Sequence, residues 1–272
     1  MKTSCYSLLS LLSVILLFSC STPRYIYSPS AHNVPVLTQK GDAQAGGYYS
    51  TNFVGEEKRN GQLIDNRSRG ADIQGAAAIS DHFAVQASYF YRWEKTSGGS
   101  DSSTVRYKRN LTEIGAGYYL PINVQKTVFF QLFVGGGLGK FSFTDVDKTA
   151  ANFHEANVVK VYLQPAVLFR SKGSFTSSVS LRASILNYSK IKTSYSANEL
   201  NNYNLDSLNN RGKIFFEPGF TCSFGFKNVP GLRLAFHGGF SFLVSRHLID
   251  YRIINLSAGT WFDIESLFRK AK

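Results

Sequence analysis

The chain has few cysteines, and their positions exclude the chemistries that need several of them. The 272 residues include three, Cys5, Cys20 and Cys222. Cys5 lies within an apolar leader and Cys20 at its end, so Cys222 is alone in the body of the chain. A single thiol excludes an intrachain disulfide framework and a cysteine-rich zinc site. We therefore expect neither a metal nor a cofactor.

The sequence also lacks an uninterrupted apolar run of ~20 residues, the length a helix needs to cross a bilayer. Its most apolar stretch, residues 8–18, is broken by Ser10 and Ser13 and follows Lys2. A short apolar run behind a positive charge at the N-terminus is typical of a signal peptide that is later removed. We expect residues 1–19 to be that signal peptide, so the protein is exported.

Acidic residues are scarce. There are 18 Asp and Glu against 30 Lys and Arg, a formal net charge of +12. The basic residues are scattered and form no dense basic helix, so we expect no nucleic-acid partner. Outer-membrane lipid, including an anionic glycolipid such as lipopolysaccharide, is the more natural counter-charge.

From about residue 42 onward the sequence alternates with period two, in segments rich in Tyr, Phe, Val and Ile. This pattern is typical of strands. Most segments exceed the ~5–6 residues of a common strand and suit the ~9–11 residues of a tilted bilayer-crossing strand. With no Pro/Ser-rich linker to divide it, residues 42–264 are predicted to be one all-β, antiparallel, up-and-down β-barrel of about ten strands, followed by a short tail, 265–272. The predicted strands are 42–53, 69–79, 82–95, 104–120, 127–143, 157–170, 174–190, 212–227, 231–244 and 251–264.

The connections between these segments alternate between long and short, and the longest is 191–211. Outer-membrane barrels have short periplasmic turns and long outer loops. Because the strand count is even and the first connection is long, both termini are predicted at the periplasmic end. Residues 20–41 are predicted to be an extended tether, since Pro23, Pro29 and Pro35 exclude a continuous helix. The long outer loops would serve any protein partner.

One face of each strand is apolar and the other is polar. If the apolar face contacts lipid, the polar face lines the lumen. Unpaired buried charges are very costly, so we expect ion pairs and hydrogen bonds to fill a narrow barrel. A small anion-preferring channel is the alternative. The predicted lumen-facing residues are Asp72, Gln74, Gln86, Arg92, Arg109, Glu113, Gln131, Lys160, Tyr162, Gln164, Arg182, Glu217, Arg233 and His237.

Two other functions remain open at this stage. A barrel enzyme acting on lipid or peptide, a hydrolase or acyltransferase, needs a histidine near a carboxylate at one rim. His154 with Glu155 and His247 with Asp250 are the pairs predicted in outer loops, but neither belongs to a recognisable motif, and no catalytic residue is assigned. A soluble calyx that binds lipid inside is the second alternative, because alternation does not fix which face points inward.

Two stretches resemble known proteins. Residues 17–20, Leu-Phe-Ser-Cys, are similar to the lipobox of bacterial lipoproteins, which implies that Cys20 is acylated, for example with palmitate, and becomes the first mature residue. The tether, with Pro29, the run 33–37 and Lys40-Gly41-Asp42, resembles the opening of a group of outer-membrane β-barrel lipoproteins of Bacteroidota. Residues 80–85 at the second turn fit the same group. The resemblance implies a lipid-anchored outer-membrane barrel but no reaction.

Two further features are interpreted through that resemblance. The residues after Cys20, Ser-Thr-Pro-Arg, lack the acidic run that resembles a surface-export signal in this phylum, which favours an anchor facing the periplasm. Asp206-Ser207-Leu208 resembles the phylum's O-glycosylation motif, which implies a glycan on Ser207. The sequence as a whole predicts a structural, surface-interaction or weak transport role.

Overall fold

The chain forms a closed β-barrel, which confirms the predicted fold class. The computed structural model describes residues 24–53, 58–59, 62–63, 68–97, 104–146, 151–171, 174–245 and 249–264. The predicted signal peptide, Cys20, His247 and the tail 265–272 lie outside these ranges. No helix among the described residues is long and apolar enough to cross a membrane.

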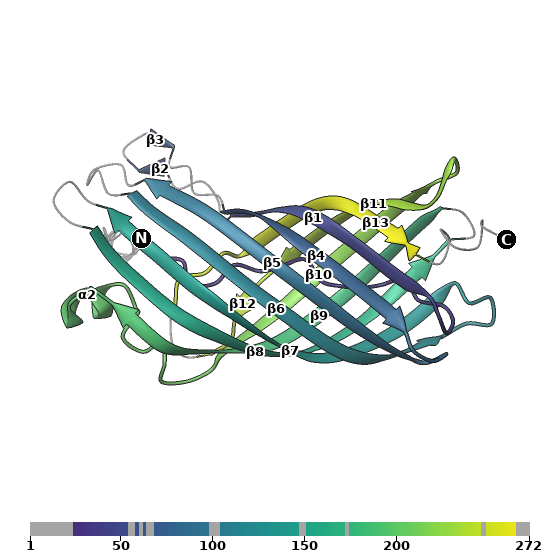
Figure 1. The fold of residues 1–272 in the computed structure, drawn as a ribbon, viewed down its shortest axis with the longest axis horizontal. Coiled ribbons are helices and arrows are strands. Elements are labelled where there is room, and N and C mark those ends of the chain that lie inside the picture. The colour runs from purple at the N-terminus through teal and green to yellow at the C-terminus, as the bar shows by residue number, and fades with distance from the viewer. Residues whose placement is uncertain are drawn as a thin grey trace, which may run out of the picture.

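Ten long strands make the wall of the barrel, and each pairs antiparallel with both neighbours (Figure 1). The order is β11-β13-β1-β4 and then in sequence to β10, whose pairing with β11 closes the barrel. The long strands are β1 (Ala43–Phe53), β4 (Ser68–Ala78), β5 (Phe83–Ser97), β6 (Thr104–Pro121), β7 (Val128–Val146), β8 (Ala151–Arg170), β9 (Phe175–Thr193), β10 (Lys213–Phe226), β11 (Val229–Phe240) and β13 (Ile254–Asp263).

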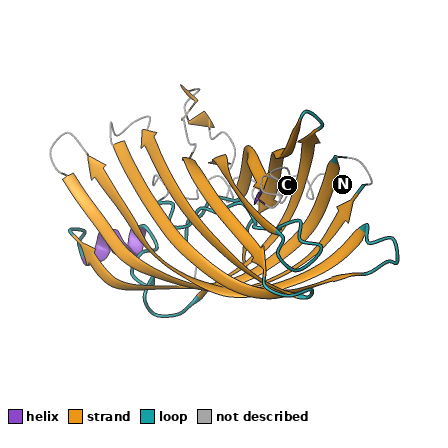
Figure 2. Ribbon diagram, turned by 45° about the vertical axis from the view of Figure 1, so that its right-hand side comes forward, coloured by secondary structure: helices purple, strands orange, loops and turns teal. Residues whose placement is uncertain are grey.

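Three short strands and one helix complete the described elements. β12 (Phe242–Leu243) adds to β10, and β2 (Lys58–Arg59) pairs with β3 (Gln62–Leu63). The helix α2 (Ala197–Asn202) lies in the connection between β9 and β10. Figure 2 shows α2 beside one end of the barrel, where the long strands of the wall end.

The strand limits agree with the predicted segments to within three residues, except at two places. β11 ends at Phe240, earlier than predicted. β8 begins at Ala151 and β7 continues to Val146, so most of the loop predicted over 144–156 is strand. These residues pair in register, from Phe141↔Ala156 to Val146↔Ala151, and therefore extend the β7–β8 pair beyond the predicted segments.

Two kinds of connection lie at opposite ends of the barrel. Short ones, such as 79–82 between β4 and β5 and 227–228 between β10 and β11, define what we call the turn end. Longer ones, such as 54–67 and 194–212, define the loop end. β1 begins and β13 finishes at the turn end, where Gln44 pairs with Asp263. An even number of strands requires this arrangement.

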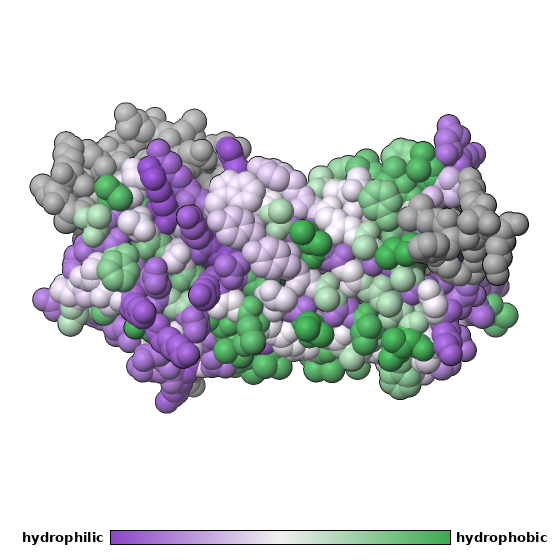
Figure 3. Space-filling model, viewed as in Figure 1, coloured by the Kyte–Doolittle hydropathy of each residue, from purple (hydrophilic) through white to green (hydrophobic). Residues whose placement is uncertain are grey.

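The outside of the wall is apolar and the inside polar, the reverse of a soluble barrel. On β8, Val159, Val161, Leu163 and Phe169 are exposed, whereas Lys160 between them is 1% exposed. The eleven positions from Val159 to Phe169, at ~3.4 Å each and tilted by ~45°, cover about 25 Å, the height of a membrane barrel's apolar band. Figure 3 shows apolar side chains over the part of the wall nearer the turn end. A calyx with a polar exterior is excluded.

Candidate functional site: a lumen closed by the N-terminal segment

Residues Arg24–Leu37 run through the lumen from the loop end to the turn end (Figure 1, purple). We call them the plug segment. Every residue from Arg24 to Pro35 is buried, and Leu37 has no exposed surface. The stretch is extended, as predicted for the tether, but it occupies the inside of the barrel.

The first residues of the plug segment are fixed at the loop end. The guanidinium of Arg24 pairs with Asp145, close to the end of β7, and lies 4.2 Å from the ring centroid of Tyr203. The Arg24 amide donates to Oδ2 of Asp250 at 2.9 Å, and the next plug residues follow the same connection, with Tyr27 bridging to Tyr251. This end of the lumen is therefore sealed by aromatic and ionic contacts.

Lumen side chains take the place of strand partners for the plug backbone. The amide of Ala31 donates to Oδ2 of Asp72 at 3.0 Å, and Nε2 of Gln74 donates to the Ala31 carbonyl at 2.7 Å. The carbonyl of Asn33 accepts from Nε2 of Gln164 at 2.7 Å. A buried extended chain outside a sheet must find such partners, because unpaired backbone groups are costly. This explains why the lumen is rich in Asp, Gln, Asn and Arg.

The contacts come from nearly the whole wall. Side chains of β1 and of each long strand from β4 to β11 hydrogen-bond to the plug segment. Near the middle, the hydroxyl of Tyr27 donates to Oε1 of Glu217 at 2.6 Å, and Nδ1 of His32 lies 2.8 Å from Oγ of Ser180. Contacts on all sides hold the segment near the axis of the lumen.

Buried ion pairs fill the space around the plug segment. Both oxygens of Asp72 accept from Arg92, with Nη2 to Oδ2 at 2.9 Å. The carboxylate of Glu113 forms ion pairs with Nζ of Lys160 at 2.9 Å and with Nη1 of Arg182 at 3.5 Å. A second group joins Glu94 to Arg109 at 3.1 Å and also to Arg252. The lumen is thus filled both by these ion pairs and by the chain itself.

The residues predicted to face the lumen do lie on the inner side of the wall. All are buried except Arg233, which is half-buried near the turn end and donates to Ser223 and Thr176 at 3.0 and 3.1 Å. His237 meets the plug directly, because its Nε2 accepts the amide of His32 at 3.2 Å. The predicted set therefore surrounds the plug segment.

Several members of the site are absent from the set of residues predicted from the sequence. Glu94 could have been found, since it shares the inner face of β5 with Arg92. Asp145 and Arg252 lie near strand ends, where alternation gives no clear face. The plug itself has one signal: no charged residue occurs between Arg24 and Lys40, which is unusual for a tether in water.

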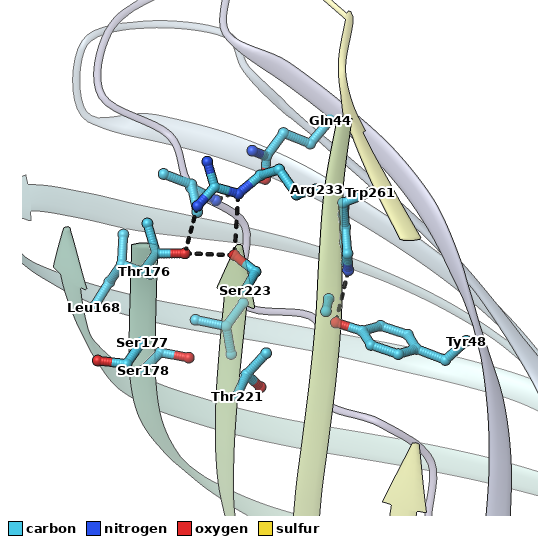
Figure 4. A pocket seen from close by; sticks show the side chains of 13 residues that line it. Gln44, Tyr48, Leu168, Thr176, Ser177, Ser178, Thr221, Ser223, Arg233 and Trp261 are labelled. Carbon is cyan, nitrogen blue, oxygen red and sulfur yellow. Dashed lines mark hydrogen bonds between the residues drawn. The ribbon is translucent and has the colours of Figure 1, made fainter. Parts of the chain in front are cut away.

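The described residues of the lumen enclose two small cavities. One cavity of about 20 Å³ lies near the turn end, between β9, β10, β11 and β13. Figure 4 shows Arg233 over Thr176 and Ser223 on one side of it, and Trp261 donating to Tyr48 on the other. A second cavity of about 20 Å³ lies beside Tyr27. Each has room for about one water molecule, far below the ~300 Å³ of a ligand pocket.

The histidines give no catalytic arrangement in the described ranges. His154 lies on β8 and not in a loop, is fully buried, and stacks on Phe143 at 5.5 Å, whereas Glu155 points outward. The prediction that His154 and Glu155 lie in an outer loop is therefore wrong, and as neighbours on a strand the two side chains face opposite sides. Among these residues no histidine ring is hydrogen-bonded to a carboxylate, and no group of three His, Cys, Asp or Glu could hold a metal.

The two termini, predicted at one end of the barrel, lie outside the described residues, and the described chain starts and finishes at opposite ends. The plug segment carries the chain back through the lumen, so Arg24 lies at the loop end while Ile264 lies at the turn end. The even strand count correctly places the start of β1 and the end of β13 together, but it does not fix where the preceding residues go.

The outer surface of β5, β6 and β7 near the loop end is basic. Along the outer face of β5, Tyr89, Tyr91 and Trp93 follow the apolar residues, and Lys95 comes next. The adjacent strands β6 and β7 place Arg106, Lys108 and Lys140 nearby, all exposed (Figure 3). Aromatic residues followed by cations are typical of the boundary between the bilayer core and the headgroups. We call Lys95, Arg106, Lys108 and Lys140 the basic patch.

The connection that holds Ser207 also lies at the loop end. Its helix α2 begins with a capping box, in which the hydroxyl and amide of Ser196 donate to the carboxylate of Glu199 and lower its pKa. Ser207 itself is half-buried, and its carbonyl accepts from Nζ of Lys213 at 3.1 Å. The next residue, Leu208, is fully buried.

The fold and the site define a closed membrane-type β-barrel whose lumen is occupied by its own chain. No protein-family model and no curated protein sequence matches it. An outer membrane channel from Pseudomonas putida F1 has a TM-score of 0.42 at 8% identity, covering 85% of this chain and 99% of its own.

Two other solved structures show similar agreement. The translocator domain of the autotransporter NalP from Neisseria meningitidis has a TM-score of 0.46 at 12% identity, with coverage of 84% of this chain and 89% of that one. Ail, the attachment invasion locus protein of Yersinia pestis, has a TM-score of 0.38 at 12% identity, with coverage of 82% and 98%. At these values no functional assignment is transferred to this chain.

Proposed function

We propose that this protein is a lipid-anchored outer-membrane β-barrel that does not conduct and presents its loop end for surface interaction, of the Bacteroidota lipoprotein type described above. The observation that carries the proposal is the plug segment inside a barrel with an apolar exterior. The apolar band of about 25 Å supports a bilayer setting. The lipobox-like residues 17–20 support the anchor on Cys20.

A closed lumen disfavours the transport role. Conduction through a barrel needs a continuous polar path along the axis. Here Arg24–Leu37 occupies that axis. Of the basic side chains that suggested an anion channel, Arg92 and Lys160 pair with carboxylates, Arg109 also donates to the plug backbone, and Arg233 donates to the hydroxyls of Ser223 and Thr176. The structural and surface-interaction roles are the ones we retain.

Planar-bilayer recording of the refolded mature chain tests the proposal. We expect no conductance steps from the intact chain and stepwise conductance after deletion of residues 25–37. Deletion of the equally long stretch 55–67 is the matched control, because its described residues pair only with each other. Steps of equal size from the intact chain would contradict a closed lumen.

We propose lipopolysaccharide as the lipid that faces the basic patch. The patch lies beyond the aromatic side chains of β5, the level at which anionic headgroups meet a barrel. Four cations on three adjacent strands match a phosphorylated glycolipid better than a zwitterionic one. This assignment places the loop end at the outer leaflet.

We also propose that Ser207 carries an O-linked glycan, on the basis of its motif and its position in the loop-end connection. Mass spectrometry of the native protein should show a sugar mass on the peptide that contains Ser207. Ser207→Ala should remove it and Ser194→Ala, in the same connection, should not. An unmodified Ser207 in the native protein contradicts this proposal.

A further inference from the structure

We infer that the acyl chains on Cys20 insert into the membrane leaflet at the loop end, on the same side as the long loops. This inference rests on the proposed acylation of Cys20. It reverses the expectation that the anchor and the start of the first strand share a leaflet. The chain would begin at the cell surface, return through its own barrel, and only then enter β1.

The direction of the plug segment carries the first step. Leu37 packs with Ala78, Ala84 and Tyr119, which lie at or near the turn-end limits of β4, β5 and β6. Arg24, at the other end of the segment, pairs with Asp145 near the loop-end limit of β7. Thirteen steps of ~3.3 Å give about 43 Å of extended chain, enough to pass the ~25 Å apolar band.

The reach of the preceding chain carries the second step. Cys20 is four residues before Arg24. Four residues span at most about 14 Å, even fully extended. To reach the turn-end leaflet, Cys20 would have to cover the length of the plug segment again, roughly three times that distance. A lipid on Cys20 therefore reaches only the loop-end leaflet.

The wall of the barrel is not equally long on all sides at the loop end. β7 and β8 extend to Val146 and Ala151, but β1, β13 and β11 end in register at Phe53, Ile254 and Phe240. The first plug residues lie against residues 249–252, which lead into β13 on the shorter side, and Arg24 also pairs with Asp145 on the longer side. The exposed aromatic rings there, Phe240 and Phe242, face lipid. The plug segment thus begins at the loop end in contact with both the longer and the shorter side of the wall.

Thiol labelling on intact cells tests the inference with the full chain. In a Cys222→Ser background, in which acylated Cys20 has no free thiol, one labelable cysteine is placed by Thr22→Cys, Asn209→Cys or Val124→Cys. Asn209 is exposed at the loop end, and Val124 is 96% exposed at the turn end. The measurement is the label taken up from a membrane-impermeant maleimide, divided by the label taken up after denaturation. Normalising in this way removes differences in the amount of protein and of free thiol between the variants.

We expect the labelling ratio of Thr22→Cys to match that of Asn209→Cys. In a sealed membrane both ratios should be about tenfold above the ratio of Val124→Cys. A ratio for Thr22→Cys equal to that of Val124→Cys would overturn the inference. If the barrel were inserted the other way up, Asn209 and Val124 would exchange values, and the inference would still require Thr22 to follow Asn209.

The acylation itself is measured separately, so the two failures can be told apart. Mass spectrometry of the N-terminal peptide should show acyl chains on Cys20, and Cys20→Ala should lose them. Absence of acyl chains from the native protein overturns the anchor. Acyl chains on Cys20 combined with turn-end labelling of Thr22 overturn only its placement at the loop end.

Discussion

A Cβ atom at Gly219 would lie 2.8 Å from Nδ1 of His32, closer than real Cβ atoms approach a neighbour. Gly219 belongs to β10 and His32 to the plug segment, 187 positions earlier in the chain. The wall therefore lacks a side chain where His32 of the plug segment lies against β10. The stability of variants at this one glycine therefore tests where the plug segment lies.

We predict that Gly219→Val destabilises the folded protein by about 1–3 kcal/mol, because the added side chain overpacks the lumen against His32. The readout is the temperature at which the folded band converts to the unfolded band in SDS gels, or the urea midpoint. Replacing His32 by Ala in the Gly219→Val background should restore part of the loss.

Gly238 supplies the matched control. It pairs with Phe220 in the same strand pair, but a Cβ there would meet only Leu256 on the outer face, at 3.6 Å. Gly238→Val should leave the midpoint nearly unchanged. If Gly219→Val changes the midpoint as little as Gly238→Val, the lumen beside Gly219 is empty and the plug segment does not lie there.

A second prediction concerns the pair of Asp72 and Arg92, which are 1% and 0% exposed. Asp72→Leu leaves a buried guanidinium without its carboxylate, and the loss of a buried partner costs about 3–5 kcal/mol. Adding Arg92→Met should recover much of that stability, since a well-packed apolar pair often replaces a buried ion pair. If the double variant is no more stable in urea than Asp72→Leu, the ion pair with Arg92 is not the reason why Asp72 stabilises the fold.

The sequence allowed the wall to be predicted but not what fills it. Each strand has its own alternation, so the limits of β1 or β6 follow from local residues. The plug segment has no periodicity, and its partners are distant in sequence; Arg24, for example, meets Asp250, 226 positions away. Its placement depends on the inner faces of nine strands acting together, which no local pattern records.

The basic patch gives a third prediction. Lys95→Gln combined with Arg106→Gln and Lys108→Gln should weaken binding to vesicles that contain lipopolysaccharide. At ~1 kcal/mol per cation near an anionic surface, the loss is on the order of 100-fold, and added salt should reduce binding of the unaltered protein. Flotation of the vesicles measures it.

The control for this experiment replaces three exposed cations at the turn end, by Lys40→Gln, Lys126→Gln and Arg170→Gln. The net charge changes equally, so an unspecific charge effect would reduce binding equally in both variants. Equal losses would remove the assignment of lipopolysaccharide to the loop-end patch.

The central claim is that Arg24–Leu37 occupies the lumen, and hydrogen exchange tests it most directly. The amides of Ala31, His32 and Val36 donate to Asp72, His237 and Gln44 at 3.0, 3.2 and 2.7 Å. In the refolded protein in nanodiscs, peptides that cover these residues should exchange as slowly as peptides from the barrel strands, because both open only with the barrel. Complete exchange at the rate of an unstructured peptide would place the segment outside the barrel and contradict the account.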